Sequence, residues 1–67
     1  MTLYLLDFWN KFDAYPQKLT YYDKTQNIQD IITDKIEMDE FCEKNSDCEV
    51  IDFAISFKEN YIYVEIE

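Results

Sequence analysis

The sequence contains no arginine, no histidine and no glycine, and it has one proline and two cysteines. Without histidine the usual general base of catalysis is missing, and without arginine no side chain can clamp a phosphate through two parallel hydrogen bonds. The absence of glycine excludes the glycine-rich loops that cradle phosphates. A carboxylate pair can act as acid and base, but a chain of 67 residues hardly encloses a pocket that raises a carboxyl pKa. We therefore expect a protein that is not an enzyme and has no small-molecule substrate.

The charge of the chain is strongly one-sided. Fifteen Asp and Glu residues stand against six Lys residues, which gives a net charge of −9. Such a charge repels nucleic acid and anionic lipid and speeds association with basic proteins. The apolar stretch 2–9 is interrupted by Asp7 and lacks a basic leader, so we expect neither a secretory signal nor a membrane span. These features predict a cytoplasmic protein whose partner is a basic protein.

Metal and disulfide chemistry have little support. Cys42 and Cys48 are too few for a disulfide framework, and a zinc site would need two further Cys or His ligands that the chain lacks. Two reduced thiols and a single link between them both remain open. The run 45–49 offers oxygen ligands on alternate residues, as a calcium loop does, but it lacks the turn glycine and the distant bidentate glutamate. We expect no metal and no cofactor.

A first helix is predicted near the N-terminus. Its apolar residues lie at i, i+3, i+4 and i+7: Leu5, Phe8, Trp9 and Phe12. Thr2 can serve as its N-cap, and Pro16 disfavours helical geometry at Tyr15, where we expect the helix to end. An edge strand over residues 2–6 is the alternative, because that stretch also contains residues typical of sheets.

A second helix is predicted from the isoleucines that follow. They lie at helical spacing: Ile28, Ile31, Ile32 and Ile36. A capping signal precedes them, either at Asp23 or at Asn27. In the same phase Asp39 would fall inside the apolar arc. We therefore expect a break near residues 37–39, after which Asp39 caps a last short turn over residues 40–45.

Strands are predicted elsewhere. Residues 18–22 suit a short edge strand, and residues 51–57 and 61–66 alternate apolar and polar side chains. Asn60 can take the left-handed conformation in the loop between these runs, which predicts a β-hairpin. Its apolar face should cover the helices, and its other face should show Asp52, Ser56, Tyr61, Tyr63, Glu65 and Glu67. The predicted fold is a single α+β domain over residues 1–67, in the order α-β-α-β-β, with a small antiparallel sheet packed on one or two helices.

Eight of the fifteen acids lie in the segment 30–49. They are the candidate partner-binding residues Asp30, Asp34, Glu37, Asp39, Glu40, Glu43, Asp47 and Glu49. On the predicted second helix, the first three would form a row of carboxylates about 5.4 Å apart, as in a phosphate strand. A solvated helix face is the alternative. Because like charges at this spacing destabilise a helix, their density favours a binding role.

The tyrosines are the last group: Tyr4, Tyr15, Tyr21, Tyr22, Tyr61 and Tyr63. Tyrosine among carboxylates suits a protein interface, where aromatic anchors supply most of the binding energy and acids steer the approach. Half-buried sheet tyrosine is the alternative. We expect no stacking on nucleic-acid bases, because that use needs a basic groove beside the rings.

In its length, its acid row, its acid-rich segment 37–49 and its tyrosines, the chain resembles the small acidic inhibitors of phages and mobile elements, including anti-CRISPR proteins and DNA-mimic proteins. No diagnostic motif contributes to the resemblance. It implies a protein that blocks the basic nucleic-acid-binding surface of a nuclease or host-defence enzyme. An immunity protein or antitoxin that neutralises a cognate toxin is a second interpretation, and a structural or assembly module is a third.

Overall fold

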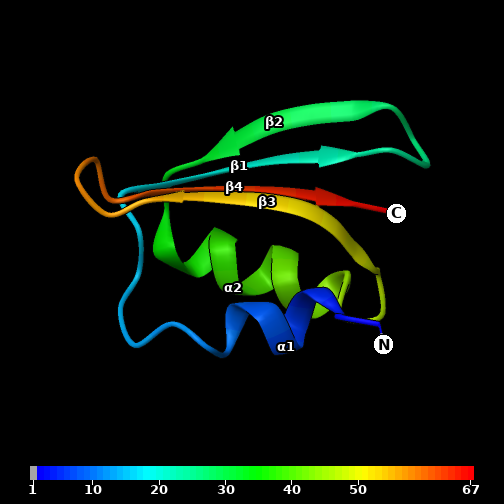
Figure 1. Ribbon diagram of the computed structural model, residues 1–67, viewed down its shortest axis with the longest axis horizontal. Coiled ribbons are helices and arrows are strands. Elements are labelled where there is room, and N and C mark those ends of the chain that lie inside the picture. Colours follow the sequence, from blue (N-terminus) through cyan, green and yellow to red (C-terminus); the bar gives the residue numbers. More distant parts are fainter. Residues whose placement is uncertain (1) are drawn as a thin grey trace.

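Two β-hairpins form one mixed sheet, and two helices cover one of its faces (Figure 1). The computed structural model describes residues 2–67. Along the chain its elements are α1 (Leu5–Trp9), β1 (Lys18–Asp23), β2 (Ile28–Ile32), α2 (Lys35–Lys44), β3 (Val50–Ser56) and β4 (Tyr61–Ile66). The strand order is β2-β1-β4-β3; β1 runs parallel to β4, and the other two pairings are antiparallel. The α+β class is confirmed, whereas the element order is α-β-β-α-β-β and the sheet is not purely antiparallel.

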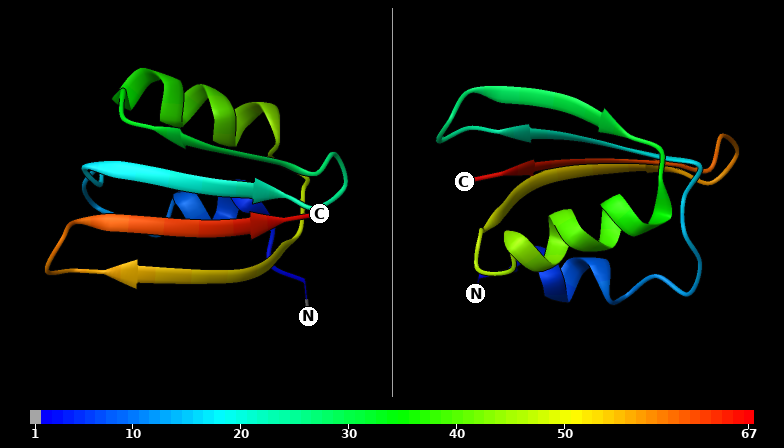
Figure 2. Two further views of the ribbon diagram at one scale, coloured as in Figure 1. Left: turned by 90° about the horizontal axis from the view of Figure 1, so that it is seen from above. Right: turned by 180° about the vertical axis from the view of Figure 1, so that it is seen from behind.

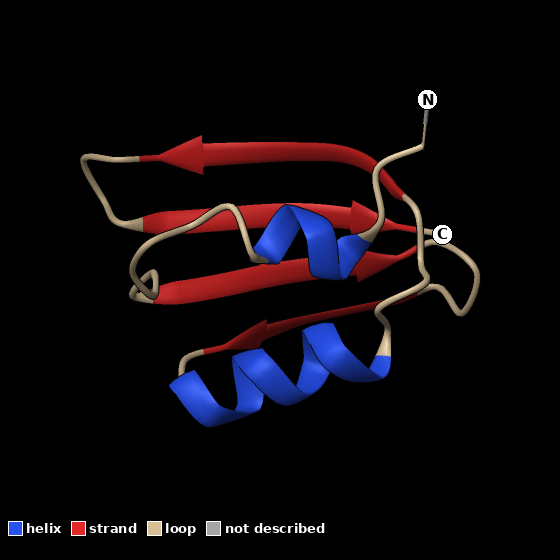
Figure 3. Ribbon diagram, turned by 90° about the horizontal axis from the view of Figure 1, so that it is seen from below, coloured by secondary structure: helices blue, strands red, loops and turns tan. Residues whose placement is uncertain are grey.

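The two helices divide the covered face between them. α1 lies across the central strands, and α2 lies along the side of the sheet that β2 forms (Figure 3). The view from above shows no helix over the other face of the sheet (Figure 2). We call this uncovered side the open face.

The isoleucine segment Ile28–Ile32 is a strand, so the first half of the predicted second helix is wrong. All five of its residues pair with Leu19–Asp23 of β1. Asn27 takes a positive φ of 55° in the turn before it, and the Asp23 carboxylate accepts hydrogen bonds from two backbone N–H groups of that turn. β-Branched side chains suit a pleated, half-buried surface. The tight turn and the pairing therefore outweigh the helical spacing of the isoleucines.

The helix α2 begins where Asp34 caps it. The backbone of Asp34 is extended, and its carboxylate accepts a hydrogen bond of 3.0 Å from the backbone N–H of Glu37. The helix then runs without a break from Lys35 to Lys44. The predicted break at residues 37–39 is therefore wrong. Asp39 is not a cap, because its side chain accepts hydrogen bonds from residues in and after α1.

The first predicted helix is confirmed in place and shorter than expected. It spans Leu5–Trp9, follows Tyr4 rather than Thr2, and ends well before Tyr15. Leu5, Phe8 and Trp9 of its predicted apolar stripe are buried, whereas Phe12 lies beyond the end of the helix and is partly buried. Tyr4 forms an isolated antiparallel bridge with Glu49, which accounts for the strand-like character of residues 2–6.

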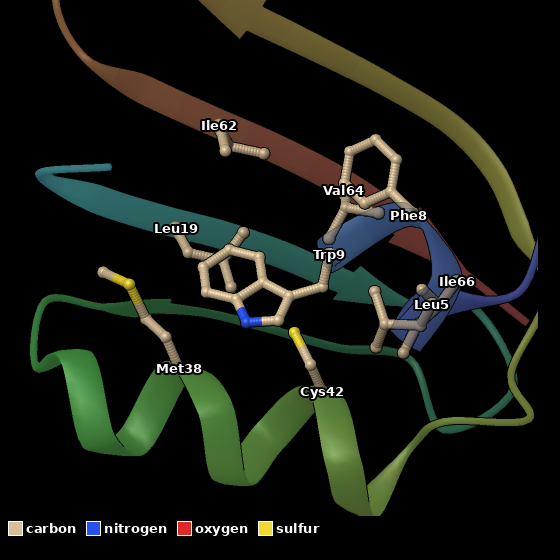
Figure 4. Close-up of a cluster of buried hydrophobic side chains, with 9 residues drawn as sticks. All are labelled: Leu5, Phe8, Trp9, Leu19, Met38, Cys42, Ile62, Val64 and Ile66. Carbon is tan, nitrogen blue, oxygen red and sulfur yellow. The ribbon is translucent and has the colours of Figure 1, made fainter. Parts of the chain in front are cut away.

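The core lies between the helices and the sheet (Figure 4). Its buried side chains are Leu5, Phe8, Trp9, Leu19, Met38, Cys42, Ile62, Val64 and Ile66. Both cysteines are free thiols, and burial raises the pKa of Cys42 to about 12. Phe41 lies at the margin of the core, where its ring stacks on Tyr21 at 4.1 Å between centroids. Phe41, which is partly buried, therefore helps to pack α2 on β1.

The sheet confirms the predicted hairpin and corrects the predicted edge strand. β3 and β4 pair antiparallel, and Asn60 has a φ of 54° in the loop between them. Three apolar residues of β4 are buried against the helices, as predicted, whereas β3 contributes less than predicted, because Phe53 is 48% exposed and the register shifts between Val50 and Asp52. β1, however, lies between β2 and β4 and is a central strand. Its neighbour on the side away from β4 is β2, the segment for which the sequence predicts a helix.

Two substitutions of Asp34 distinguish the effect of its capping hydrogen bond on stability from the effect of its negative charge. Asp34→Ala should lower the free energy of unfolding by about 1 kcal/mol, because the Glu37 N–H loses its acceptor. Asp34→Asn removes the same charge and keeps a capping oxygen, so it should stay within about 0.3 kcal/mol of the parent. Urea unfolding followed by circular dichroism measures both. Equal stability of the two variants would show that α2 does not begin at this residue.

Candidate partner-binding surface

The predicted row of Asp30, Asp34 and Glu37 does not exist on a single helix. Asp30 lies in β2, where its Oδ1 accepts a hydrogen bond of 2.8 Å from the backbone N–H of Ile31. Asp34 is the N-cap of α2, and only Glu37 lies within the helix. All three are exposed, but their carboxylates are not stacked at one helical pitch.

Three glutamates share the outer side of α2. Met38 and Cys42 are buried on the inner side of the helix. The exposed residues Glu37, Glu40 and Glu43 follow each other at intervals of three. Residues three apart on a helix are neighbours, with about 5–6 Å between their Cβ atoms. We call these residues the α2 glutamate band.

The acid surface continues beyond the end of α2. Asp47 is exposed and lines a shallow hollow together with Asp7, Tyr4, Leu6 and Ser46. Glu49 is also exposed, and its backbone is held by two hydrogen bonds, of 3.1 and 3.0 Å, to Glu67. The carboxylates after the helix are therefore presented by backbone that is paired or packed.

Asp39 has a structural role instead. Its carboxylate accepts a hydrogen bond of 2.9 Å from Trp9 Nε1 and a second from the Tyr15 hydroxyl. These bonds hold the pKa of Asp39 below its ordinary value, the tyrosine contributing most, and the same contact raises the pKa of Tyr15. Lys35 Nζ lies 5.7 Å from the centre of the Tyr15 ring. Asp39 thus ties α1 and the loop after it to α2.

A hollow lies beside Asp39, between α1, the loop after it and α2. It is lined by Trp9, Asn10, Phe12, Asp13, Ala14, Tyr15 and Asp39, and it measures about 260 Å³. This volume is below the range of roughly 300–1,000 Å³ of pockets for drug-sized ligands. The Trp9 and Tyr15 donors already bind Asp39. Two of the side-chain donors beside the hollow are therefore already engaged within the fold.

The described residues offer neither a metal-binding cluster nor a membrane-spanning helix. Within the described part of the chain, no group of three or more Cys, Asp or Glu side chains is placed to hold a metal ion. Neither helix between residues 2 and 67 has the length and apolar character needed to cross a membrane.

The open face of the sheet is a second candidate surface. Side chains alternate between the faces of a strand, so Tyr61, Tyr63 and Glu65 lie opposite the buried residues of β4. Asp52 and Ser56 of β3 lie on the same face, as predicted for the hairpin. Sequence reasoning missed the contribution of β1, because that depends on its parallel pairing with β4. Through this pairing Lys18, Thr20 and Tyr22 join the open face.

Comparison of the chain with protein-family models, with curated proteins and with solved structures found no match.

Asp39 should make the stability of the protein depend on acid pH. Because folding lowers its pKa, the stabilisation is present above about pH 3.8, the ordinary value, and is lost as the pH falls through the lower folded value. Asp39→Asn cannot titrate. The parent should therefore be more stable than this variant at pH 6, and the gap should narrow below pH 4. Urea titrations at each pH measure the gap.

Trp9 is the only tryptophan, so its fluorescence reports on the same contact. Asp39→Asn should change the emission of Trp9 in the folded state, whereas Glu40→Gln, on the outer side of the same helix, should not. Parent and Asp39→Asn curves that fall in parallel from pH 6 to pH 2 would contradict the role given to Asp39.

Proposed function

We propose that this protein is an acidic inhibitor that binds the basic nucleic-acid-binding surface of a nuclease or host-defence enzyme. The observation that supports the proposal is the α2 glutamate band, in which three exposed carboxylates are held on one rigid helix. The overall charge of −9 adds a field that attracts basic proteins and repels nucleic acid.

The proposed interface is smaller than the set of eight acids in the segment. Asp30, Asp34 and Asp39 each use their carboxylate for a hydrogen bond within the fold. The remaining candidates are exposed: Glu37, Glu40, Glu43, Asp47 and Glu49. Ile36 lies beside them at the start of α2 and is 67% exposed, so it offers an apolar contact at the edge of the acid surface.

The mechanism is competition. The carboxylates of α2 take the place of phosphates as hydrogen-bond partners of Lys and Arg side chains on the target. Complementary charge speeds the encounter, and this acceleration weakens as salt is added. Because the glutamates belong to a helix packed on the sheet through Met38 and Cys42, little further ordering is needed on binding.

The role of the α2 glutamate band in binding can be tested by comparing its neutralisation with an equal loss of negative charge elsewhere on the surface. The protein is immobilised, a partner is captured from an extract of its own cells at low salt, and the dissociation constant of the purified partner is measured. Glu37→Gln, Glu40→Gln and Glu43→Gln together should weaken binding at least about tenfold, which corresponds to about 1.4 kcal/mol. The control combines Asp13→Asn, Asp30→Asn and Glu59→Gln and should weaken binding less than about threefold.

A fluorescent oligonucleotide bound to the captured partner then tests competition. The inhibitor should displace it, and the triple variant of the band should displace it poorly. A complex that holds inhibitor and oligonucleotide together would contradict the mechanism. Equal weakening by the two triple variants would show that net charge acts without the band. The identity of the partner distinguishes a defence nuclease from a cognate toxin.

A further inference from the structure

The open face carries tyrosine rings and a pair of opposed carboxylates on neighbouring strands. Tyr61 and Tyr63 are half-buried on β4, and Tyr22 is half-buried on β1. Thr20, which is paired with Tyr63 in the sheet, is only 6% exposed although no helix covers it. Ile31 of β2 is aligned with Thr20 on its other side, so side chains of the neighbouring strands, tyrosines among them, form the cover on this face of the sheet.

Two carboxylates face each other at one end of this surface. Asp52 of β3 is aligned with Glu65 of β4, and Tyr22 of β1 is aligned with Glu65 on its other side. Like charges directly opposite each other across two strands are destabilising. Burial and the nearby charges of Glu65 and Asp52 raise the pKa of the Tyr63 hydroxyl, as expected in a negative field. A cation placed here would relieve the repulsion between the two acids.

The other end of the surface already holds a cation against a ring. Lys18 Nζ lies 5.4 Å from the centre of the Tyr61 ring. This distance is within the roughly 6 Å over which a ring face attracts a cation. The Tyr61 ring therefore already has a cation at its face, and Tyr63 lies two residues further along the same strand. No lysine of β1 is aligned with Tyr63, because its partner there is Thr20.

Charge decides what can occupy this face. A second copy of the chain would bring a further net charge of −9 to a face that already carries Asp52 and Glu65. A nucleic acid would bring phosphates into the same negative field. A guanidinium group suits both features, because it stacks on aromatic rings and binds carboxylates through paired hydrogen bonds.

We propose that the open face is a second docking surface, which binds an arginine side chain of the partner protein against Tyr63 and the carboxylates of Asp52 and Glu65. This inference rests on the proposed function, because the basic surface of the partner supplies the arginine. The α2 glutamate band and the open face lie on different layers of the molecule (Figure 2). Each can therefore be removed without the other.

Two peptides of equal charge test this surface: hexa-arginine and hexa-lysine, titrated into the isotope-labelled protein at physiological salt and followed by amide chemical shifts. Hexa-arginine should bind at least about fivefold more tightly than hexa-lysine, since only the guanidinium stacks and binds in a bidentate way. Its largest shifts should fall on Tyr22, Asp52, Tyr63 and Glu65. The triple variant of the α2 glutamate band should keep these shifts.

Tyr63→Ile keeps a β-favouring apolar side chain and removes the ring, so it should fold and lose the preference for arginine. Tyr63→Phe keeps the ring and should bind as the parent does. Equal binding of hexa-arginine to parent and Tyr63→Ile would overturn the inference, as would shifts confined to α2. Tighter binding of a thymidine oligonucleotide to the open face would also overturn it. The competition experiment with the captured partner can still succeed in each of these cases, so failure here is distinct from failure of the proposed function.

Discussion

β1 and β4 run side by side in parallel over six residue pairs, from Lys18 with Tyr61 to Asp23 with Ile66. Among residues 2–67 this pairing is the one strand contact that joins the β1–β2 hairpin to the β3–β4 hairpin. Parallel strands need a crossover connection, and α2 lies within the one used here. This connection places α2 against the face of the sheet on which Leu19 and Val64 are buried. Both the core and the outward side of α2 depend on this one pairing.

The same pairing of β1 with β4 determines where the charged side chains lie. It leaves one face of the central strands without a helix, so that face is covered by side chains of the strands themselves, with tyrosine prominent among them. Acids that lie inside the architecture are held by specific donors, as Asp23 is in its turn and Asp39 is beside Trp9. The other acids lie on the surface. Their mutual repulsion weakens the fold, and their negative field attracts a basic partner. The two proposed docking surfaces are where such repulsion is concentrated on ordered backbone.

Local patterns predicted those parts of the fold that local physics decides. The alternation of residues 61–66, the positive φ of Asn60 and the stripe of α1 were all confirmed. The helix predicted from the isoleucines of 28–32 was wrong, because their spacing fits a helix while their branching fits a strand. Asp34 and Glu37 also form a capping signal in the sequence, which the prediction did not use and which marks the start of α2.

The remaining errors concern contacts that no local pattern encodes. Asp39 meets Trp9 and Tyr15 across 30 and 24 residues, so its structural role could not be separated from a binding role in the sequence. The central place of β1 follows from a parallel register, which leaves no signal in either strand alone. For the same reason the sequence showed the tyrosines of the open face but not their common surface with Lys18 and Tyr22.

Inter-strand nuclear Overhauser effects in the labelled protein test the parallel pairing most directly. We predict backbone contacts between β1 and β4 in a parallel register, with Tyr21 beside Val64, together with antiparallel contacts between β1 and β2. Sequential helical contacts over residues 28–32, or an antiparallel register between β1 and β4, would contradict this account of the fold and of the two surfaces it presents.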